Sequence, residues 1–256
     1  MYSRFLHQFY HLGMRPRSLY SRGYPCLITR QFHTKTKTFN RLGPHNSDVT
    51  SVLVGCLLGD AYAVKSIGTK FRIKQSVRHK DYLFFLYDFF YQRGYCSNSG
   101  PRGYKTILIN SSLSSGATKK EKTYYGYEFD IFTFSSFNWL YDLFYVNHKK
   151  VISPQIHLYL TPLSIAFLLM DDGCWVSGSK SVRIATNCFE RQEVELLRDI
   201  FYTKFNLDCT IQLLTKKGVK NPKDKFSLYI KVSSLPLLRE LVLPYMHSSM
   251  LYKLGL

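Results

Sequence analysis

The stretch "IAFLLMDDGCW" (residues 165–175) is an apolar run that ends in two adjacent carboxylates, Asp171 and Asp172, followed by a glycine. A second stretch, "LVGCLLGDAYA" (residues 53–63), has the same form and places Asp60 after its apolar run. Nearly continuous apolar residues predict a helix that is buried on most sides. Each stretch therefore predicts a buried helix that ends at an acidic residue.

The two acidic motifs lie in halves of the chain that repeat one order of predicted elements. Asp60 lies in the first half and Asp172 in the second. In both halves, residues that alternate between apolar and polar predict strands, and amphipathic stretches of helical period predict helices. After the first motif we predict a strand at 69–76, a helix at 79–93, strands at 104–110 and 123–134, and a helix at 135–146. After the second we predict a strand at 181–187, a helix at 190–205, strands at 209–215 and 226–232, and a helix at 235–246. We therefore expect two copies of one mixed α/β (α+β) unit.

The start of the chain differs in composition from the rest. Residues 1–47 carry eight Lys or Arg and no Asp or Glu, which is typical of a mitochondrial transit peptide; a basic arm or an upstream fused segment is the alternative. Removing these eight charges from the formal +18 leaves +10, so the body still favours a polyanionic partner such as nucleic acid or an anionic membrane surface. We expect a leader at 1–45, a first repeat at 46–152 and a second repeat at 153–256.

Neither the cysteines nor the apolar runs indicate another class of protein. The six cysteines form no C-x-x-C pair. We therefore interpret them as reduced thiols and not as ligands of a zinc site or members of a disulfide framework. The longest apolar runs are interrupted by proline or ended by aspartate and are too short to cross a bilayer. We expect a soluble or at most peripheral protein.

A matched pair of aspartates suits metal-dependent hydrolysis of phosphodiester bonds. Mg²⁺ binds hard oxygen ligands, usually one or two carboxylates with water and phosphate oxygens. A helix C-terminus disfavours a carboxylate unless a cation is bound there. Gly55 and Gly59 share one helix face and would let two motif helices approach closely, which would bring Asp60 and Asp172 together. One such motif is more often a plain helix end, but two of them in matching halves of a basic chain favour the metal site.

The nonamers "LVGCLLGDA" (53–61) and "IAFLLMDDG" (165–173) carry a family resemblance together with their flanks. The flanks are "LGPHNSDV", "YLTPLSIA", "RIATNCF" and "PYMHSSMLYKLG". Over residues 40–256 the chain resembles LAGLIDADG homing endonucleases, in the single-chain form encoded by fungal mitochondrial group I introns. The resemblance implies two pseudo-symmetric αββαββα repeats, with the motif helices at the interface and saddle-shaped antiparallel sheets that straddle DNA.

The resemblance also implies roles for individual residues. The last acid of each motif, Asp60 and Asp172, would bind Mg²⁺, for which Mn²⁺ is expected to substitute. Asp171 occupies the small-residue position before the ligand, and we interpret it as a helper or helix-end residue. The sequence departs from the consensus at three packing positions, Leu58, Phe167 and Ala61.

Related enzymes keep a basic residue near each metal to polarise the attacking water or stabilise the phosphate. By position these residues resemble Lys150 and Lys253 here. A lysine in a Lys-Lys pair or near a chain end is usually solvated, and that alternative stays open. Gln75 and Asn187, each at the end of a predicted strand after its motif helix, are weaker candidates for contact with the metal ligands.

DNA recognition is expected on the sheets, where alternation can direct one row of side chains at a groove and its phosphates. Five basic residues lie on predicted strands: Arg72, Lys74, Lys105, Arg183 and Lys231. The basic loops at 118–122 and 216–225 suit flanking phosphates. For each residue taken alone, a solvated charged face is the alternative.

The sequence favours a mitochondrial, site-specific double-strand DNA endonuclease that acts in intron homing as a monomer with an internal pseudo-two-fold axis. The alternative is an RNA maturase that assists splicing of its own group I intron, alone or as a second function. A basic sheet suits RNA phosphates equally well, and splicing assistance needs no metal carboxylate. A degenerate DNA-binding relic is disfavoured, because drift is expected to erode Asp60, Asp172 or the two lysines first.

Overall fold

The computed structural model describes residues 36–109, 121–214 and 225–256. The predicted leader up to residue 35, including Cys26, lies outside the described residues. Most of the two basic loops predicted at 118–122 and 216–225 lies outside them as well. Within the described part of the chain, no helix has the length and apolarity needed to cross a membrane, and the five cysteines found there are unpaired.

The first half contains one antiparallel sheet with helices before, between and after its two pairs of strands. Its elements are α2 (Ser47–Leu58), β1 (Tyr62–Lys65), β2 (Thr69–Ser76), α3 (Lys80–Gln92), β3 (Arg102–Ile109), β4 (Glu121–Asp130) and α4 (Asn138–Phe144). The four strands are ordered β1-β2-β4-β3, and each neighbouring pair is antiparallel. This half therefore has the order αββαββα.

The second half repeats the same order. Its elements are α5 (Pro162–Asp172), β7 (Gly173–Val176), β8 (Ser181–Ala185), α6 (Arg191–Phe205), β9 (Cys209–Leu213), β10 (Phe226–Ile230) and α7 (Leu235–Val242). The strands are ordered β7-β8-β10-β9, again antiparallel throughout. The prediction of two αββαββα units is confirmed.

Short elements connect the main ones. They are η1 (Thr38–Asn40), η2 (Val77–His79), η3 (Ser135–Phe137), β5 (Tyr145–Val146), β6 (Lys149–Lys150), η4 (Pro154–Leu158), η5 (Val232–Ser234), η6 (Leu243–Tyr245) and η7 (Ser248–Leu254). The helices predicted at 135–146 and 235–246 are each part α-helix and part 3-10 helix, and the first is shorter than predicted, because Tyr145–Val146 form β5. The strand predicted at 226–232 ends at Ile230, so Lys231 lies beyond it.

The sequence pattern does not predict β1 and β7. Each has four residues and follows directly on an acidic motif, so neither is long enough to show a clear alternation. β4 ends at Asp130, earlier than the predicted end at 134. Pairing with β2 continues past Asp130, since the backbone N–H of Ile131 donates to the carbonyl of Phe71 (2.9 Å) and Phe134 forms an antiparallel bridge with Thr69. The register slips by one residue between these contacts, and the N–H of Phe132 donates to the carbonyl of Tyr95 (2.8 Å), so the regular strand ends at Asp130.

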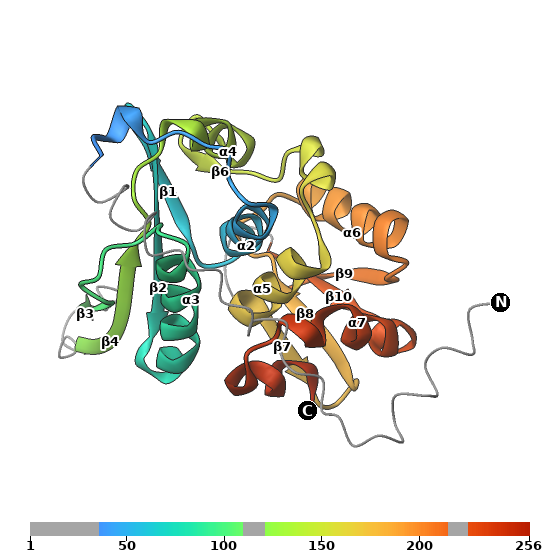
Figure 1. Ribbon diagram of the computed structural model, residues 1–256. Coiled ribbons are helices and arrows are strands. Elements are labelled where there is room, and N and C mark those ends of the chain that lie inside the picture. The colour runs from blue at the N-terminus through green and yellow to red at the C-terminus, as the bar shows by residue number, and fades with distance from the viewer. Residues whose placement is uncertain (1–35, 110–120, 215–224) are drawn as a thin grey trace, which may run out of the picture.

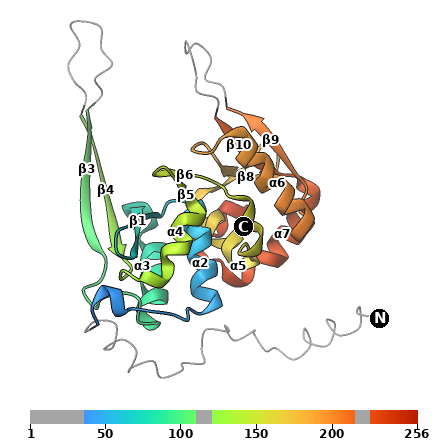
Figure 2. The same cartoon turned by 90° about the horizontal axis from the view of Figure 1, so that it is seen from above.

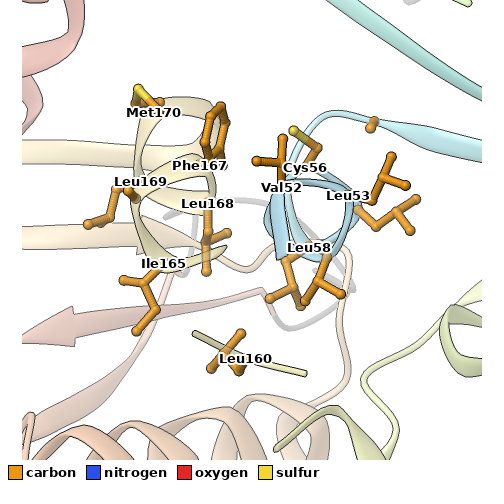
Figure 3. Packing of buried hydrophobic residues seen from close by; sticks show 14 of the residues in the cluster. Val52, Leu53, Cys56, Leu58, Leu160, Ile165, Phe167, Leu168, Leu169 and Met170 are labelled. Carbon is orange, nitrogen blue, oxygen red and sulfur yellow. The ribbon is translucent and has the colours of Figure 1, made fainter. Parts of the chain in front are cut away.

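The motif helices α2 and α5 pack side by side at the centre of the molecule, between the two sheets (Figure 1). In Figure 3, Phe167 of α5 points toward α2, and the labelled apolar side chains of both helices fill the space around the pair. A Cβ atom at Gly55 would lie 2.3 Å from the carbonyl oxygen of Ser164 and 2.9 Å from Cβ of Phe167. The close approach predicted at this glycine is therefore present.

The start of α5 is set by its sequence. The Thr161 hydroxyl accepts a hydrogen bond from the backbone N–H of Ser164 (3.1 Å), and the Ser164 hydroxyl accepts one from the backbone N–H of Thr161 (2.8 Å). Pro162 occupies the first turn, where its missing N–H costs nothing. This reciprocal cap fixes where the helix begins; the helix ends at Asp172, because its C-cap Gly173 is extended.

The strands alternate between a buried and an outer face. β2 buries Phe71, Ile73 and Gln75, and its intervening basic residues lie on the outer face. Figure 2 shows the β3–β4 hairpin and the β9–β10 hairpin projecting to the same side of the molecule, with the helix pair between them. This is the two-armed arrangement expected of paired saddle-shaped sheets.

Candidate active site

The acidic ends of the two motif helices have different environments. α2 ends at Leu58, Gly59 is its C-cap, and Asp60 follows in a turn as an exposed residue. α5 continues through Asp172, which is half-buried. The backbone N–H of Asp60 donates to Asp171 Oδ2 (3.3 Å), so the acidic residues of the two halves lie at the same end of the helix pair.

The acidic residue of the first half changes the pKa values of the acidic residues of the second half. The pKa of Asp172 is raised to about 7, first by burial and then by the charge of Asp60, while Lys253 and Lys150 oppose the rise. Burial and the charge of Asp60 also raise the pKa of Asp171 well above its ordinary value. The charge of Asp60 disfavours ionisation of both Asp171 and Asp172, which marks a point of negative potential that favours a bound cation.

Asp171 is buried and links the two halves. Its Oδ1 accepts hydrogen bonds from the Tyr82 hydroxyl (2.9 Å) and from the Gln75 amide (3.0 Å). Its Oδ2 accepts the bond from the backbone of Asp60. A Cβ atom at Gly59 would lie 2.5 Å from Cβ of Asp171, so the turn and the aspartate fit together only with a glycine. Asp171 therefore orders the turn that carries Asp60.

Gln75 contacts acids from both halves, whereas Asn187 lies in an exposed turn beyond β8. The Gln75 amide nitrogen donates to Asp60 Oδ2 (2.9 Å) and to Asp171 Oδ1 (3.0 Å). Gln75 is buried at the end of β2, with 4% of its surface exposed. Gln75 and Asn187 are predicted as equivalent residues, but Gln75 contacts the acids and Asn187 lies in an exposed turn.

Thr186 occupies the place of Gln75 in the second half. Strand pairing aligns Tyr62 opposite Arg72 and Cys174 opposite Arg183, so the second hairpin is one residue shorter than the first. When the halves are aligned at Asp60 and Asp172, the alignment therefore shifts by one position between the motif acids and β8. A one-residue slip exchanges the two faces of a strand, which is why Asn187 is displaced from the site.

Lys150 and Lys253 each bind carbonyl groups at the end of the motif helix in their own half. Lys150 Nζ donates to the carbonyls of Gly59 (2.9 Å) and Ala61 (2.8 Å). Lys253 Nζ donates to the carbonyl of Asp171 (2.7 Å) and to the one before it. Burial lowers the pKa of both lysines. Each ammonium group satisfies orphan carbonyls at a helix C-terminus, so neither lysine is a freely solvated surface side chain.

The oxygen donors at this end of the helix pair fit a hard divalent cation. Asp60 and Asp172 supply one carboxylate from each half. Among the residues that the structure describes, no group of three or more His, Cys, Asp or Glu side chains is placed to hold an ion by itself. Mg²⁺ commonly takes one or two protein carboxylates and completes its octahedron with water and phosphate oxygens. The sparse donor set fits that mode of binding.

The outer face of the first sheet carries a network of ion pairs. Arg72 hydrogen-bonds both carboxylate oxygens of Asp130 (2.5 and 3.0 Å), and Lys74 pairs with Glu128 (2.8 Å). Arg102 pairs with both acids, at 2.7 Å to Glu128 and 3.1 Å to Asp130. The face presents a row of cations, but part of their charge is neutralised within the sheet.

Lys105 lies on the opposite face of the first sheet from Arg72 and Lys74. Arg102 shares a row with Lys74, because both pair through Glu128 of β4. Lys105 is three residues further along β3, and successive side chains alternate between faces. Lys105 is exposed there, so it does not belong to the single row of DNA contacts that the sequence predicts.

The second sheet carries far fewer charges on its outer face. Arg183 lies opposite Tyr229, and a hydrogen bond with that tyrosine is the main cause that raises the pKa of Arg183. Lys231, just past β10, pairs with Asp208 (2.6 Å). Lys225, just before β10, continues the row of Ser227 and Tyr229 and is exposed; the backbone N–H of Leu214 donates to its carbonyl (2.7 Å). The remaining residues of this face that the structure describes are uncharged: Cys174, Val176, Ser181, Ala185, Thr210, Gln212, Ser227 and Tyr229.

Three further residues belong to the site but are not singled out by the sequence. Tyr82 has the place of a core residue on the apolar stripe of α3, yet its hydroxyl bonds to Asp171. His79 Nδ1 lies 3.2 Å from Gln75 Oε1, and His79 Nε2 lies 3.2 Å from the Tyr252 hydroxyl. The sequence feature that could have identified His79 is its position four residues after Gln75, where a strand passes into a helix.

Comparison with known proteins points to one family. Residues 50–238 match the model of the LAGLIDADG DNA endonuclease family. The chain is 33% identical over 238 residues to the cytochrome b mRNA maturase bI2 of Saccharomyces cerevisiae, which covers 90% of this chain and 52% of that protein. It is 39% identical over 172 residues to the intron-encoded endonuclease ai4 of Dictyostelium discoideum, which covers 67% of this chain and 99% of that protein. The chain therefore spans about half the length of the yeast maturase.

A solved structure of similar architecture agrees with this result. The homing endonuclease I-WcaI bound to its DNA recognition sequence covers 95% of this chain and 95% of its own, with a TM-score of 0.64 and 26% identity. The duplicated acidic motif, the repeated αββαββα order and the family match are mutually consistent. The chain belongs to the LAGLIDADG DNA endonuclease family.

Proposed function

We propose that this protein is a site-specific endonuclease that cuts both strands of a long DNA target, as a monomer, and acts in intron homing. The observation that carries the proposal is the meeting of Asp60 and Asp172, one from each half, at one end of the α2–α5 pair. The sheets on either side of this end can bind the duplex on both sides of the scissile bonds (Figure 2). The similarity to I-WcaI, which was solved with its DNA recognition sequence, supports DNA as the partner.

We propose Mg²⁺ as the cofactor, bound by Asp60 and Asp172, with Mn²⁺ as a substitute. A divalent ion there would act as a Lewis acid and lower the pKa of a bound water. Lys150 and Lys253 hold ammonium groups beside the acids, where they can stabilise negative charge that develops on the phosphate. Because carbonyl groups already orient both lysines, this stabilisation requires little rearrangement.

The sheets would supply the DNA contacts. The outer face of the first sheet can exchange its internal ion pairs for phosphate contacts, and the outer face of the second sheet, which is mostly polar and uncharged, can make hydrogen bonds to base edges. Lys105 and Lys231 lie outside these two rows and suit flanking phosphates. The proposed contact residues are Arg72, Lys74, Lys105, Arg183 and Lys231.

The test is cleavage of a supercoiled plasmid that carries the intronless target, in Mg²⁺, by the wild type and by Asp60→Asn and Asp172→Asn. We expect each variant to retain DNA binding in a mobility-shift assay and to lose cleavage by about a thousandfold or more, because a bound metal supplies several kcal/mol to the transition state. Asp142→Asn is the matched control, since this exposed carboxylate of α4 pairs with Lys65 and belongs to neither motif. Undiminished double-strand cleavage by either site variant would refute the proposal.

A second candidate is an RNA maturase that assists splicing of its own group I intron, alone or together with cleavage. The observation in its favour is the similarity to the yeast protein named cytochrome b mRNA maturase bI2. That similarity and the acid-free leader also support a mitochondrial location. Splicing of the cognate intron in vitro by the Asp60→Asn, Asp172→Asn double variant separates the roles. A maturase function that is separable from cleavage requires splicing to persist, so its loss would refute it.

A further inference from the structure

We propose that His79 is a positioning residue that orients Gln75 toward Asp60, and that this support exists in only one half of the site, so that the two DNA strands depend on it unequally. The inference rests on the proposed endonuclease function. It concerns the chain Tyr252–His79–Gln75–Asp60, in which each consecutive pair is within hydrogen-bonding distance.

The Gln75 amide must point its nitrogen at the acids. Its Nε2 lies 2.9 Å from Asp60 Oδ2 and 3.0 Å from Asp171 Oδ1, so both amide hydrogens are used. The opposite orientation would bring Oε1 against the carboxylate of Asp60, to which an amide oxygen has no hydrogen to offer. Gln75 can hold the exposed Asp60 carboxylate only while its amide keeps this orientation.

His79 selects that orientation. Because the Gln75 nitrogen faces the acids, its Oε1 faces His79 Nδ1 at 3.2 Å and accepts the hydrogen carried there. In the neutral ring, Nε2 is then an acceptor, and the Tyr252 hydroxyl lies 3.2 Å from it as the donor. A flipped Gln75 amide would set its NH₂ group against the Nδ1 hydrogen, so His79 penalises the wrong orientation.

The chain of hydrogen bonds crosses between the halves. His79 closes η2 just before α3, and Tyr252 lies on η7 at the other end of the sequence. Tyr252 is adjacent to Lys253, which binds the end of α5. The element that places the lysine of the second half therefore also supports the acid of the first half.

Among the residues that the structure describes, none supports Asp172 in the way that Gln75 supports Asp60. At the place of Gln75 the second half has Thr186, whose hydroxyl donates to the carbonyl of Phe226 (2.8 Å), inside its own sheet. The same alignment places Glu190 where the first half has His79. The Glu190 side chain pairs with Lys149 (2.6 Å) and caps the start of α6. Asp172 is positioned instead by its own helix and by burial.

The test compares His79→Asn with His79→Leu on a target duplex labelled on one strand or on the other. Asparagine keeps an N–H donor near the place of Nδ1, whereas leucine has a similar size and no donor. We expect His79→Leu to slow the cutting of one strand about tenfold relative to the other, the worth of one hydrogen bond, so that nicked circles accumulate from plasmid. His79→Asn should stay within about threefold of the wild type, and Tyr252→Phe should shift the same strand by less.

Thr186→Val, at the corresponding place in the second half, is the matched control and should leave the ratio of the two strand rates unchanged. DNA binding, measured by mobility shift, should be the same for all of these variants. If His79→Leu slows both strands equally, or neither, while the wild type cuts both, the inference is wrong and the endonuclease proposal stands. If the wild type leaves the intronless target uncut, the endonuclease function fails, and this inference fails with it.

Discussion

The two motif helices occupy equivalent positions in the repeat but have opposite shapes where they meet. When the motifs are aligned at Asp60 and Asp172, Gly55 of α2 corresponds to Phe167 of α5, and Gly59 corresponds to Asp171. The large side chains of α5 lie against the glycines of α2, since added Cβ atoms at Gly55 and Gly59 would collide with α5. A symmetric pair would set like against like. Here the duplicated helices have become complementary, as in an interface between two different chains.

The same inequality extends from the helices to the acids and the sheets. Asp60 is exposed and receives hydrogen bonds through Gln75, whereas Asp172 is half-buried with its pKa raised to about 7. The first sheet has an outer face of ion pairs, and the second has an outer face of mostly uncharged residues with fewer cations. The fold repeats while the chemistry does not, which suits a target whose two halves differ in sequence.

The largest effect on stability is expected from Phe167, the larger residue of the Phe167–Gly55 contact. Phe167→Ala removes a fully buried ring that lies against Gly55 and between the aromatic residues of α3. We expect the free energy of unfolding to fall by about 3–5 kcal/mol, from lost burial and the cavity left behind. Chemical denaturation measures it. A loss below about 1 kcal/mol would mean that α2 and α5 do not pack as described.

Gly55→Ala tests the smaller partner. The added Cβ would lie 2.3 Å from a backbone oxygen, which cannot rotate away, so the helices must separate. Overpacking of this kind costs about 1–3 kcal/mol, although alanine's higher helix propensity returns about 1 kcal/mol. Gly178→Ala is the control, because nothing lies within 4 Å of a Cβ there. Equal thermal unfolding of both variants would contradict the asymmetric packing.

Acid should destabilise the first sheet more than the second. Burial raises the pKa of Glu128, but hydrogen bonds from Lys74 and Arg102 outweigh it, so the pKa is lowered from its ordinary 4.5. Asp130 is likewise lowered from 3.8, through Arg72 and Arg102. A lowered pKa stabilises the fold above the unfolded pKa, and this stabilisation is lost as pH falls through the folded pKa.

The stability at stake is on the order of 1 kcal/mol, because these ion pairs are partly exposed. The free energy of unfolding should fall less between neutral pH and pH values below 4.5 in Glu128→Gln than in the wild type, as measured by urea unfolding at each pH. Asp208→Asn is a comparison from the second half, where the ion pair with Lys231 is more exposed. A larger acid effect from Asp208 than from Glu128 would reverse the expected order of the two sheets.

The sequence predicts the features that both halves repeat, and it does not predict the contacts that differ between the halves. The αββαββα order and the two ligand candidates follow from the duplicated motif, because each copy confirms the other. Gln75 can be named from the sequence, but its bond to Asp171 joins residues 96 positions apart, across the two halves. Asn187 is misplaced as its counterpart because one hairpin is a residue shorter, which is invisible until the strands are paired.

The roles of Tyr82 and Lys150 could not be read locally either. Tyr82 is indistinguishable from a core aromatic in the pattern of α3, and only its hydroxyl reaches the site. Lys150 follows another lysine, and nothing near it shows that its ammonium group binds the carbonyls of Gly59 and Ala61. Burial and long-range contact decide both cases.

We propose that one acid from each half binds the same metal ion. The direct measurement is a crystal structure of the complex with target DNA and Mn²⁺, with anomalous scattering recorded at the manganese edge. We expect anomalous density within about 2.3 Å of carboxylate oxygens of both Asp60 and Asp172. Density bound by the acids of only one half, or located away from both aspartates, would contradict it.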